Sequence, residues 1–186
     1  MIQVLYLSYD GMTDPLGQSQ VLPYLQGLSK LGYKISLISF EKPQRYEQNK
    51  SIIQRICDEG NIDWYPQTYT KRPPILSTVW DLRQMKKTAF SLHGKKQFQI
   101  VHARSYVAAL IGRTLKKRLG VKFLFDIRGF WVDERVEGNI WNIKNPLFYF
   151  VYKFFKWKEV QLFSSADTTI SLTEAAKEEI HSWDLP

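Results

Sequence analysis

The sequence predicts an α/β protein in which a mainly parallel sheet is covered by helices on both faces, a three-layer α/β/α sandwich. Short runs rich in aliphatic and aromatic residues alternate with longer stretches whose apolar residues recur at helical spacing. The short runs are apolar on successive residues, as expected for strands that are buried on both faces. Helices between successive strands imply right-handed parallel crossovers.

The first strand and the first helix follow from residues 3–8 and from the apolar stripe behind them. QVLYLS (3–8) is a short apolar run that leads into a loop. Pro23 fits a helix only in the first turn, where backbone N–H groups lack partners. The helix is therefore expected to begin close to Ser19 or Gln20, and Gly32 ends it. Its apolar stripe consists of Val21, Leu22, Leu25, Leu28 and Leu31.

The middle of the chain continues the alternation. KISLISF (34–40) is a second apolar run, and NIDWYP (61–66) is a weaker third one. Residues 45–59 and 76–93 lie between the runs and have the length of helices. QIVHA (99–103) is the expected fourth strand.

The last part of the chain repeats the pattern. A helix from Ser105 to Leu119 carries apolar residues along one face, and Gly120 stops it. VKFLFDI (121–127) is the expected fifth strand. A long aromatic helix, a sixth strand and a final helix are expected at 146–164, 168–172 and 173–183. We therefore expect a single Rossmann-like domain over residues 1–186.

Composition agrees with one globular domain. A chain of 186 residues can bury a core without disulfides, and 44% hydrophobic and 24% charged residues argue against disorder. Cys57 is the only cysteine, so it is interpreted as a small buried residue, and a reducing, cytoplasmic location is expected. The first residues lack the positive region of a signal peptide, and no apolar run reaches the roughly 18 residues of a membrane span.

The net charge of +8 is a clear bias. Such a surface favours anionic partners, which include phosphates, nucleic acid and an anionic membrane face. Composition alone does not choose among them.

Ligands of such sheets bind outside the carboxyl ends of the strands, where the strand order reverses. The residues expected at this rim come from several separate loops and are mostly polar. They are Asp10, Gly11, Gly17 and Gln18 after the first strand, Glu41 after the second, His102, Arg104, Ser105 and Tyr106 after the fourth, Asp126 to Arg135 after the fifth, and Thr173 and Glu174 after the sixth.

Some of these residues also have a simpler structural interpretation. Ser105 can cap its helix, and Ser171 with Glu174 can form a capping box. His102 can be a hydrogen-bonded core histidine. The stretch FDIRGFWVDER (125–135) is different, because a plain turn is usually built from Gly, Asn, Pro or Ser. Its density of ionic groups favours a binding function.

Two familiar nucleotide-binding signatures are absent. No pair of glycines begins a G-x-G-x-x-G fingerprint. Gly27 and Gly32 have the spacing of a phosphate-binding loop, but Tyr33 stands where its lysine is required. The loop after the first strand remains a candidate, because Gly17 permits close backbone approach and the N–H groups behind it can receive an anion or a hydroxyl-rich ligand.

Four stretches together resemble the amino-terminal domain of a family 4 glycosyltransferase. They are DGMTDPLGQSQVLPYLQGLSKLGYKISLISFE, IVHARSYVAAL, FLFDIRGFWVDER and ISLTEAAKEEI. The resemblance implies one half of a retaining enzyme of the GT-B architecture, whose active site lies between two Rossmann-like domains. The amino-terminal domain mostly holds the acceptor. A carboxyl-terminal domain, which this chain lacks, holds the nucleotide-sugar co-substrate, a UDP- or GDP-sugar.

The resemblance also implies roles for individual residues. The Gly17 loop would face the donor diphosphate, and residues 102–106 would line the floor of the cleft. Many relatives have a histidine where this chain has Arg128, so we expect Arg128 to bind a carboxylate, a phosphate or sugar hydroxyls, oriented by Asp126 or Asp133. Arg128 and Asp126 are therefore the expected catalytic residues.

Neighbours of this pair are expected to bind substrate. Trp131 offers a flat face for a sugar ring, and Gly129 lies between it and Arg128. Asp133, Glu134 and Arg135 can bind acceptor hydroxyls or pair with one another. No metal and no further cofactor are expected, because basic side chains and dipoles can stabilise the leaving diphosphate. The chain alone is expected to be inactive.

The segment 145–163 has two interpretations. It is aromatic on nearly all faces, with Lys153, Lys156 and Lys158 interleaved. A helix packed against the sheet and the missing domain, with lysine stems covering apolar surface, explains this pattern. An interfacial helix that rests on the anionic inner face of a membrane explains it as well, and it suits enzymes with lipid-linked acceptors in polysaccharide or glycolipid synthesis.

Two other functions are weighed against the transferase. The basic balance and the aromatics would suit an anion- or nucleic-acid-binding module, but the charges are scattered and no nucleic-acid motif occurs, so no nucleic-acid partner is expected. A Rossmann enzyme that holds a ribose with Glu41 would be expected to have the glycine fingerprint.

Overall fold

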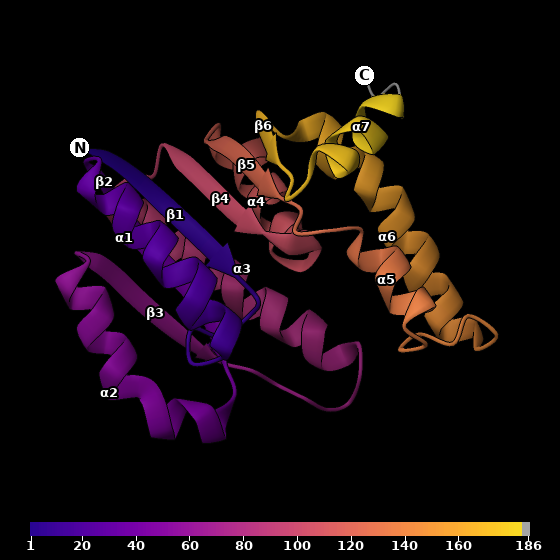
Figure 1. The fold of residues 1–186 in the computed structure, drawn as a ribbon, viewed down its shortest axis with the longest axis horizontal. Helices are drawn as coiled ribbons and strands as arrows, with labels where there is room; N and C mark the ends of the chain where they lie inside the picture. The colour runs from indigo at the N-terminus through magenta and orange to yellow at the C-terminus, as the bar shows by residue number, and fades with distance from the viewer. Residues whose placement is uncertain (184–186) are drawn as a thin grey trace.

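The computed structural model describes residues 1–183 and contains one parallel sheet covered by helices (Figure 1). The sheet has six strands in the order β3-β2-β1-β4-β5-β6. The strands are β1 (Ile2–Ser8), β2 (Tyr33–Glu41), β3 (Ile62–Thr68), β4 (Ile100–Arg104), β5 (Lys122–Asp126) and β6 (Thr168–Ile170). All the strand pairs described are parallel, so the expected Rossmann-like α/β sandwich is confirmed.

The helical segments lie between these strands. A π-helical turn, η1 (Gly17–Val21), leads directly into the first helix. The helices are α1 (Leu22–Lys30), α2 (Pro43–Glu59), α3 (Leu76–Lys96), α4 (Ser105–Leu119), α5 (Trp131–Glu137), α6 (Pro146–Ser165) and α7 (Glu174–Ser182).

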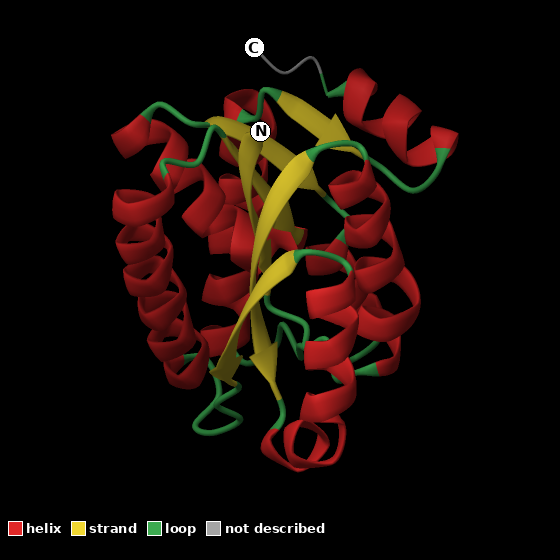
Figure 2. Ribbon diagram, turned by 90° about the vertical axis from the view of Figure 1, so that its left-hand side faces the viewer, coloured by secondary structure: helices red, strands yellow, loops and turns green. Residues whose placement is uncertain are grey.

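The strand order reverses between β1 and β4, so the two halves of the chain cover opposite faces of the sheet. Figure 2 shows the helices on both sides of the strands. One core lies under α1 and α2 and includes Leu25, Ile53 and Cys57. Burial raises the pKa of the Cys57 thiol to about 12, so it stays an unreactive thiol inside this core.

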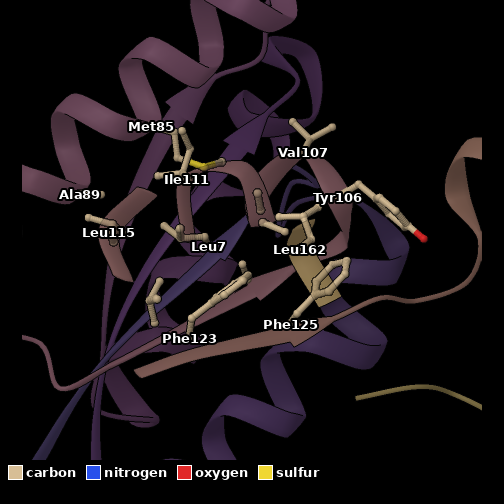
Figure 3. Close-up of a cluster of buried hydrophobic side chains, with 14 of the residues drawn as sticks. Leu7, Met85, Ala89, Tyr106, Val107, Ile111, Leu115, Phe123, Phe125 and Leu162 are labelled. Carbon is tan, nitrogen blue, oxygen red and sulfur yellow. The ribbon is translucent and has the colours of Figure 1, made fainter. Parts of the chain in front are cut away.

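The other core lies under α3, α4 and α6 (Figure 3). Met85 from α3, Ile111 from α4 and Leu162 from α6 pack there against Phe123 and Phe125 of β5. Each fully buried aliphatic or aromatic side chain stabilises the fold by about 1.5–3 kcal/mol. The reversal point between β1 and β4 thus lies between two packed cores.

One helix was not predicted. Residues Trp131–Glu137 form α5, whereas the sequence pattern predicted no helix within FDIRGFWVDER. The helix is short and no side chain caps its N-terminus. Asp133 and Glu134 in its first turn were the available signal, because acidic residues favour a helix N-terminus. Part of the charge in this stretch therefore belongs to a helix.

Candidate active site

The loop after β1 is held by a buried carboxylate, Glu41, at the end of β2. Its Oε1 accepts hydrogen bonds from the Met12 N–H (2.8 Å) and the Ser39 hydroxyl (2.6 Å). Its Oε2 accepts from the N–H and the hydroxyl of Thr13, at 3.0 and 2.6 Å. Because both oxygens accept hydrogen bonds from the protein, Glu41 is not free to hold a ribose. This argues against the alternative of a Rossmann enzyme that binds a ribose through Glu41.

Gly11 and Gly17 let the same loop fold back on itself. A β-carbon on Gly17 would lie 2.3 Å from the carbonyl oxygen of Gly11, and one on Gly11 would lie 2.7 Å from Glu41 Oε2. Both glycines are therefore required by packing. Gln18 is exposed and donates a hydrogen bond to the Thr13 carbonyl at 3.1 Å. The contact of this loop with a donor diphosphate stays a prediction.

Arg104, Asp126 and Arg128 meet at the carboxyl edge of the sheet, beside the reversal point. Arg104 and Asp126 are register partners at the ends of β4 and β5, and each is 5% exposed. Both arginines donate to the side-chain oxygen of Gln20, at 3.3 Å from Arg104 and 2.5 Å from Arg128. Arg104 also approaches Asp10 at 3.4 Å. Gln20 thus joins two guanidinium groups at this rim.

Two buried polar atoms of the rim have no hydrogen-bond partner, Asp126 Oδ1 and His102 Nε2. The Asp126 carboxylate lies 3.7 Å from His102 Nε2, 3.9 Å from Arg128 Nη1 and 4.0 Å from Arg104 Nη1. These distances are too long for hydrogen bonds. An unpaired buried polar atom costs about 1–3 kcal/mol, so such atoms are usually paired by water or a ligand. The rim can therefore accept a hydrogen bond from a ligand hydroxyl and attract an anionic group.

His102 lies between two tyrosines. Its ring centroid is 4.5 Å from that of Tyr6 and 5.7 Å from that of Tyr24. Burial, followed by the charge of Asp126, raises the pKa of both phenols. Both hydroxyls therefore stay protonated at neutral pH and remain hydrogen-bond donors. Tyr24 is 42% exposed and can meet a ligand from solvent.

The junction of β4 and α4 has no intervening loop. Ser105 follows Arg104 directly with a φ of +64°, a conformation that residues with a side chain rarely adopt. No side chain caps α4, so the interpretation of Ser105 as a cap is wrong. Tyr106 is fully buried, and its ring lies at the edge of the core cluster (Figure 3). Its hydroxyl donates to Glu159 Oε1 at 2.5 Å. The structure thus places Tyr106 in the core and not at the rim, because its ring fills the space between α4 and α6.

A second group of expected residues lines a cleft of about 1010 Å³ between α5, α6 and α7. Arg128 and Gly129 form the end of the cleft that joins the rim. Asp133, Glu134 and Thr173 line its walls. The structure therefore brings together residues from the ends of β5 and β6, as expected from their positions in the sequence.

Lys156 of α6 lines this cleft. It pairs with Asp133 at 3.0 Å and with Glu159 at 2.6 Å. Burial by itself would lower the pKa of Lys156, but the bonds to Glu159 and Asp133 outweigh it and raise the pKa. Asp133 is therefore engaged away from Arg128. Asp126 and Asp133 were the two acids expected to orient Arg128. Only Asp126 stays a candidate for this role.

Trp131 belongs to an aromatic cluster. Its ring is stacked on Tyr106 at 6.1 Å and meets Trp141 and Phe155 edge-on at 5.3 and 5.2 Å. The Arg135 guanidinium lies 5.1 Å from the ring centroid. Stacking of Trp131 on a sugar ring stays a prediction, and Arg135 is committed to the tryptophan instead of forming a clasp with neighbouring acids.

The start of α7 differs from the expected capping box. The hydroxyl of Thr173 accepts a hydrogen bond from the Ala176 N–H at 3.1 Å and caps the helix. Glu174 is exposed and pairs with Lys177 at 3.0 Å. The capping box of Ser171 and Glu174 is therefore wrong, because the next hydroxyl residue occupies the cap position.

Sequence reasoning missed Gln20, Tyr6, Tyr24 and Glu159. Only Glu159 had a local signal, since it is the one acidic residue in the aromatic segment 146–165. Among residues 1–183, no group of three or more His, Cys, Asp or Glu side chains is placed to hold a metal ion. Within the same described range, no helix has the length and apolarity to cross a bilayer.

The structure defines a Rossmann-like domain with a polar carboxyl edge, and comparison with known proteins identifies its family. The model of Glycosyltransferase Family 4 matches residues 18–186, and the chain belongs to this family. No curated protein matches the chain significantly in sequence.

Solved structures share the fold at low sequence identity. Sucrose-phosphate synthase from Thermosynechococcus elongatus is 12% identical, with a TM-score of 0.66 over 98% of this chain and 45% of that chain. MurG from Acinetobacter baumannii is 16% identical, with a TM-score of 0.52 over 93% of this chain and 42% of that chain. Arabidopsis thaliana UGT89C1, solved with UDP-L-rhamnose, is 9% identical, with a TM-score of 0.52 over 92% and 45% of the two chains. The chain thus spans less than half the length of these structures.

Proposed function

We propose that the chain is the acceptor-side domain of a retaining GT-B glycosyltransferase. The complete enzyme would transfer a sugar from a UDP- or GDP-sugar to a polar or lipid-linked acceptor, in cell-surface polysaccharide or glycolipid synthesis. Membership of family 4 supports a transferase. The similar solved structures are more than twice as long as the matched region, which supports a second domain for the donor.

The observation that carries the proposal is the incomplete rim at Asp126. Its Oδ1 and the Nε2 of His102 are buried without partners, and two guanidinium groups stand beside them. A sugar hydroxyl would complete the hydrogen bonding of Asp126 and His102. The guanidinium of Arg128 would bind a phosphate oxygen or a second hydroxyl with its planar set of donors.

The reaction follows from these roles. The acceptor oxygen forms a bond to the anomeric carbon and loses its proton, while the nucleoside diphosphate leaves with the electron pair of the broken C–O bond. Positive side chains that face the leaving group stabilise the negative charge that develops on it. Arg128 would supply this charge from the acceptor side of the cleft, so the proposal requires no metal ion.

The test is nucleoside diphosphate release with a panel of UDP- and GDP-sugars. We expect no turnover from residues 1–186 alone and turnover from a protein that also contains the proposed second domain. In that longer protein, Arg128→Ala should lower turnover about 100-fold, because one charged donor to the transition state is lost.

The matched control is Arg55→Ala, which removes an exposed cation from α2, away from the rim. It should leave turnover unchanged. Turnover by residues 1–186 alone, or an Arg128→Ala variant as active as the control, would contradict the proposal.

A further inference from the structure

A shallow groove between α3 and α4 gathers positively charged side chains. Its volume is about 290 Å³, and four of its five lining residues are positively charged. We call it the basic groove, and it is lined by Arg83, Lys86, Lys87, Phe90 and Arg118. Within residues 1–183, none of these four cations forms an ion pair with a carboxylate. The groove therefore attracts anions.

The positive surface continues from the basic groove across α4 to α6. Arg113 and Lys117 belong to the same helix as Arg118, and α4 packs on both α3 and α6. Burial, together with the charges of Arg113 and Lys117, lowers the pKa of Lys158 on α6. The packing of α4 on α6 brings these helices together. Arg113, Lys117 and Lys158 extend the uncompensated charge to the edge of α6.

The outer face of α6 adds a row of exposed apolar side chains. We call it the aromatic stripe: Leu147, Phe150, Phe154 and Trp157, which are 54%, 70%, 44% and 58% exposed. Their spacing of three, four and three residues places them along one side of the helix. The opposite side is buried in the core through Phe155 and Leu162. The helix is thus apolar on both its inner and its outer side.

Lysines accompany the aromatic stripe. Lys158 Nζ lies 4.0 Å from the centroid of the Trp157 ring and 5.6 Å from that of Phe154. Lys153 Nζ lies 5.7 Å from the ring centroid of Tyr149. Exposed aromatic rings next to lysines are the pattern of helices that lie in a membrane interface, where the rings enter the acyl boundary and the cations meet phosphates.

This surface is separate from the candidate active site. The cleft is lined on α6 by Lys156, Glu159 and Val160, and no residue of the aromatic stripe lines it. The rim is at the first residue of α4, Ser105, whereas Arg118 of the basic groove is near the other end of the same helix. The active-site chemistry therefore leaves the basic groove and the aromatic stripe unused.

We infer that the face formed by α3, α4 and α6 docks on an anionic lipid bilayer. Lipid phosphates occupy the basic groove and neutralise the cations beside it, and the aromatic stripe enters the interface. The positive charge of this face favours an anionic bilayer over a second copy of the chain. A second copy of the chain, docked through the same face, would bring these unpaired cations against their own copies. The inference concerns binding and does not depend on the transferase function.

Co-sedimentation of the 186-residue chain with lipid vesicles tests this inference. Vesicles of phosphatidylcholine with roughly one third phosphatidylglycerol should bind the chain, and binding should weaken as salt is raised. Vesicles of phosphatidylcholine alone should bind at least about tenfold more weakly.

Two sets of substitutions separate the two parts of the surface. The triple variant Lys86→Glu/Lys87→Glu/Arg118→Glu should lower binding to anionic vesicles at least about tenfold. The triple variant Phe150→Ser/Phe154→Ser/Trp157→Ser should lower it by about the same factor. All six side chains are on the surface, so circular dichroism should show an intact fold for both variants.

The matched control reverses three exposed cations on the opposite face of the sheet, Lys30→Glu/Lys50→Glu/Arg55→Glu, and should change binding less than about twofold. An equal loss in this control would overturn the inference, because net charge alone would explain it. Absence of sedimentation with anionic vesicles would overturn it too. The inference would also be overturned if analytical ultracentrifugation showed a dimer that the aromatic variant abolishes, and if the vesicles did not bind the chain.

Discussion

Glu41 and Asp126 are carboxylates at the carboxyl ends of β2 and β5, and their surroundings differ sharply. Both are buried, at 2% and 5% exposure. The oxygens of Glu41 accept four hydrogen bonds from the protein, at 2.6–3.0 Å. Asp126 Oδ1 accepts none, and the nearest guanidinium nitrogen lies 3.9 Å away.

We propose that this difference separates a structural carboxylate from a ligand-binding one at the same edge of the sheet. A buried carboxylate with a full set of donors fixes the backbone that carries those donors, as Glu41 fixes the loop at Met12 and Thr13. A buried carboxylate without hydrogen-bond donors keeps only its longer-range charge interactions, and its loss of water costs free energy. Such a group is usually completed by water or by a ligand. The four predictions below test this comparison.

The largest expected effect is the loss of stability in Glu41→Gln. The amide replaces one acceptor oxygen by an NH2 group, so two of the four donors lose their partner and face another donor. The free energy of unfolding should fall by about 2–4 kcal/mol in urea titrations. A loss below about 0.5 kcal/mol would mean that Glu41 does not hold the loop.

Asp126→Asn should have the opposite profile. No hydrogen bond accepted by the carboxylate is lost, so the free energy of unfolding should change by less than about 1 kcal/mol. In the longer protein with its proposed second domain, turnover should fall about 100-fold. Wild-type turnover in this variant would remove Asp126 from the active site.

Tyr106→Phe sharpens the comparison at a third buried carboxylate, Glu159. The variant removes the hydroxyl that donates to Glu159 Oε1 and leaves the ring in the core. Glu159 keeps its pairing with Lys156, so we expect a smaller loss of about 1–2 kcal/mol in thermal unfolding. Because Tyr106 is not at the rim, turnover should stay within about twofold of wild type. A large loss of turnover with unchanged stability would place it in the site after all.

The smallest expected effect is a change in how folding stability depends on pH, and it concerns Asp167. Burial would raise its pKa, but Lys116, the Phe123 N–H and Lys122 outweigh burial and lower the pKa to about 2. The folded pKa lies below the unfolded value of about 3.9, so the stabilisation is complete above pH ~4 and disappears as pH falls toward 2.

The matching variant is Asp167→Asn. It should be less stable than wild type at pH 6, and the two unfolding free energies should converge between about pH 4 and pH 2. A difference that stays constant over this range would show that the charge of Asp167 plays no part.

The fold could be predicted from the sequence because the strands are local apolar runs and the helices at 22–30 and 105–119 carry a local apolar stripe. Helix α5 could not, because seven residues contain too little periodicity to separate it from a charged loop. The rim residues Arg104, Asp126 and Arg128 were found for a topological reason, since the ends of parallel strands meet at one edge.

The partners within the rim could not be found in this way. Gln20 and Arg128 are 108 positions apart, and nothing near Gln20 marks it as the group that joins two arginines. The burial of Tyr106 was also hidden, because its partner Glu159 is 53 positions away. Contacts of this kind depend on how helices pack over the sheet and not on any local pattern.

The most direct test of the comparison measures unfolding free energy and nucleoside diphosphate release for Glu41→Gln and Asp126→Asn side by side. Both changes are isosteric and remove one negative charge, so each serves as the control for the other. We predict that Glu41→Gln loses the greater stability and that Asp126→Asn keeps its stability and loses turnover. If Asp126→Asn retains wild-type turnover, or loses as much stability as Glu41→Gln, the unpaired carboxylate is not the ligand-binding group of this domain.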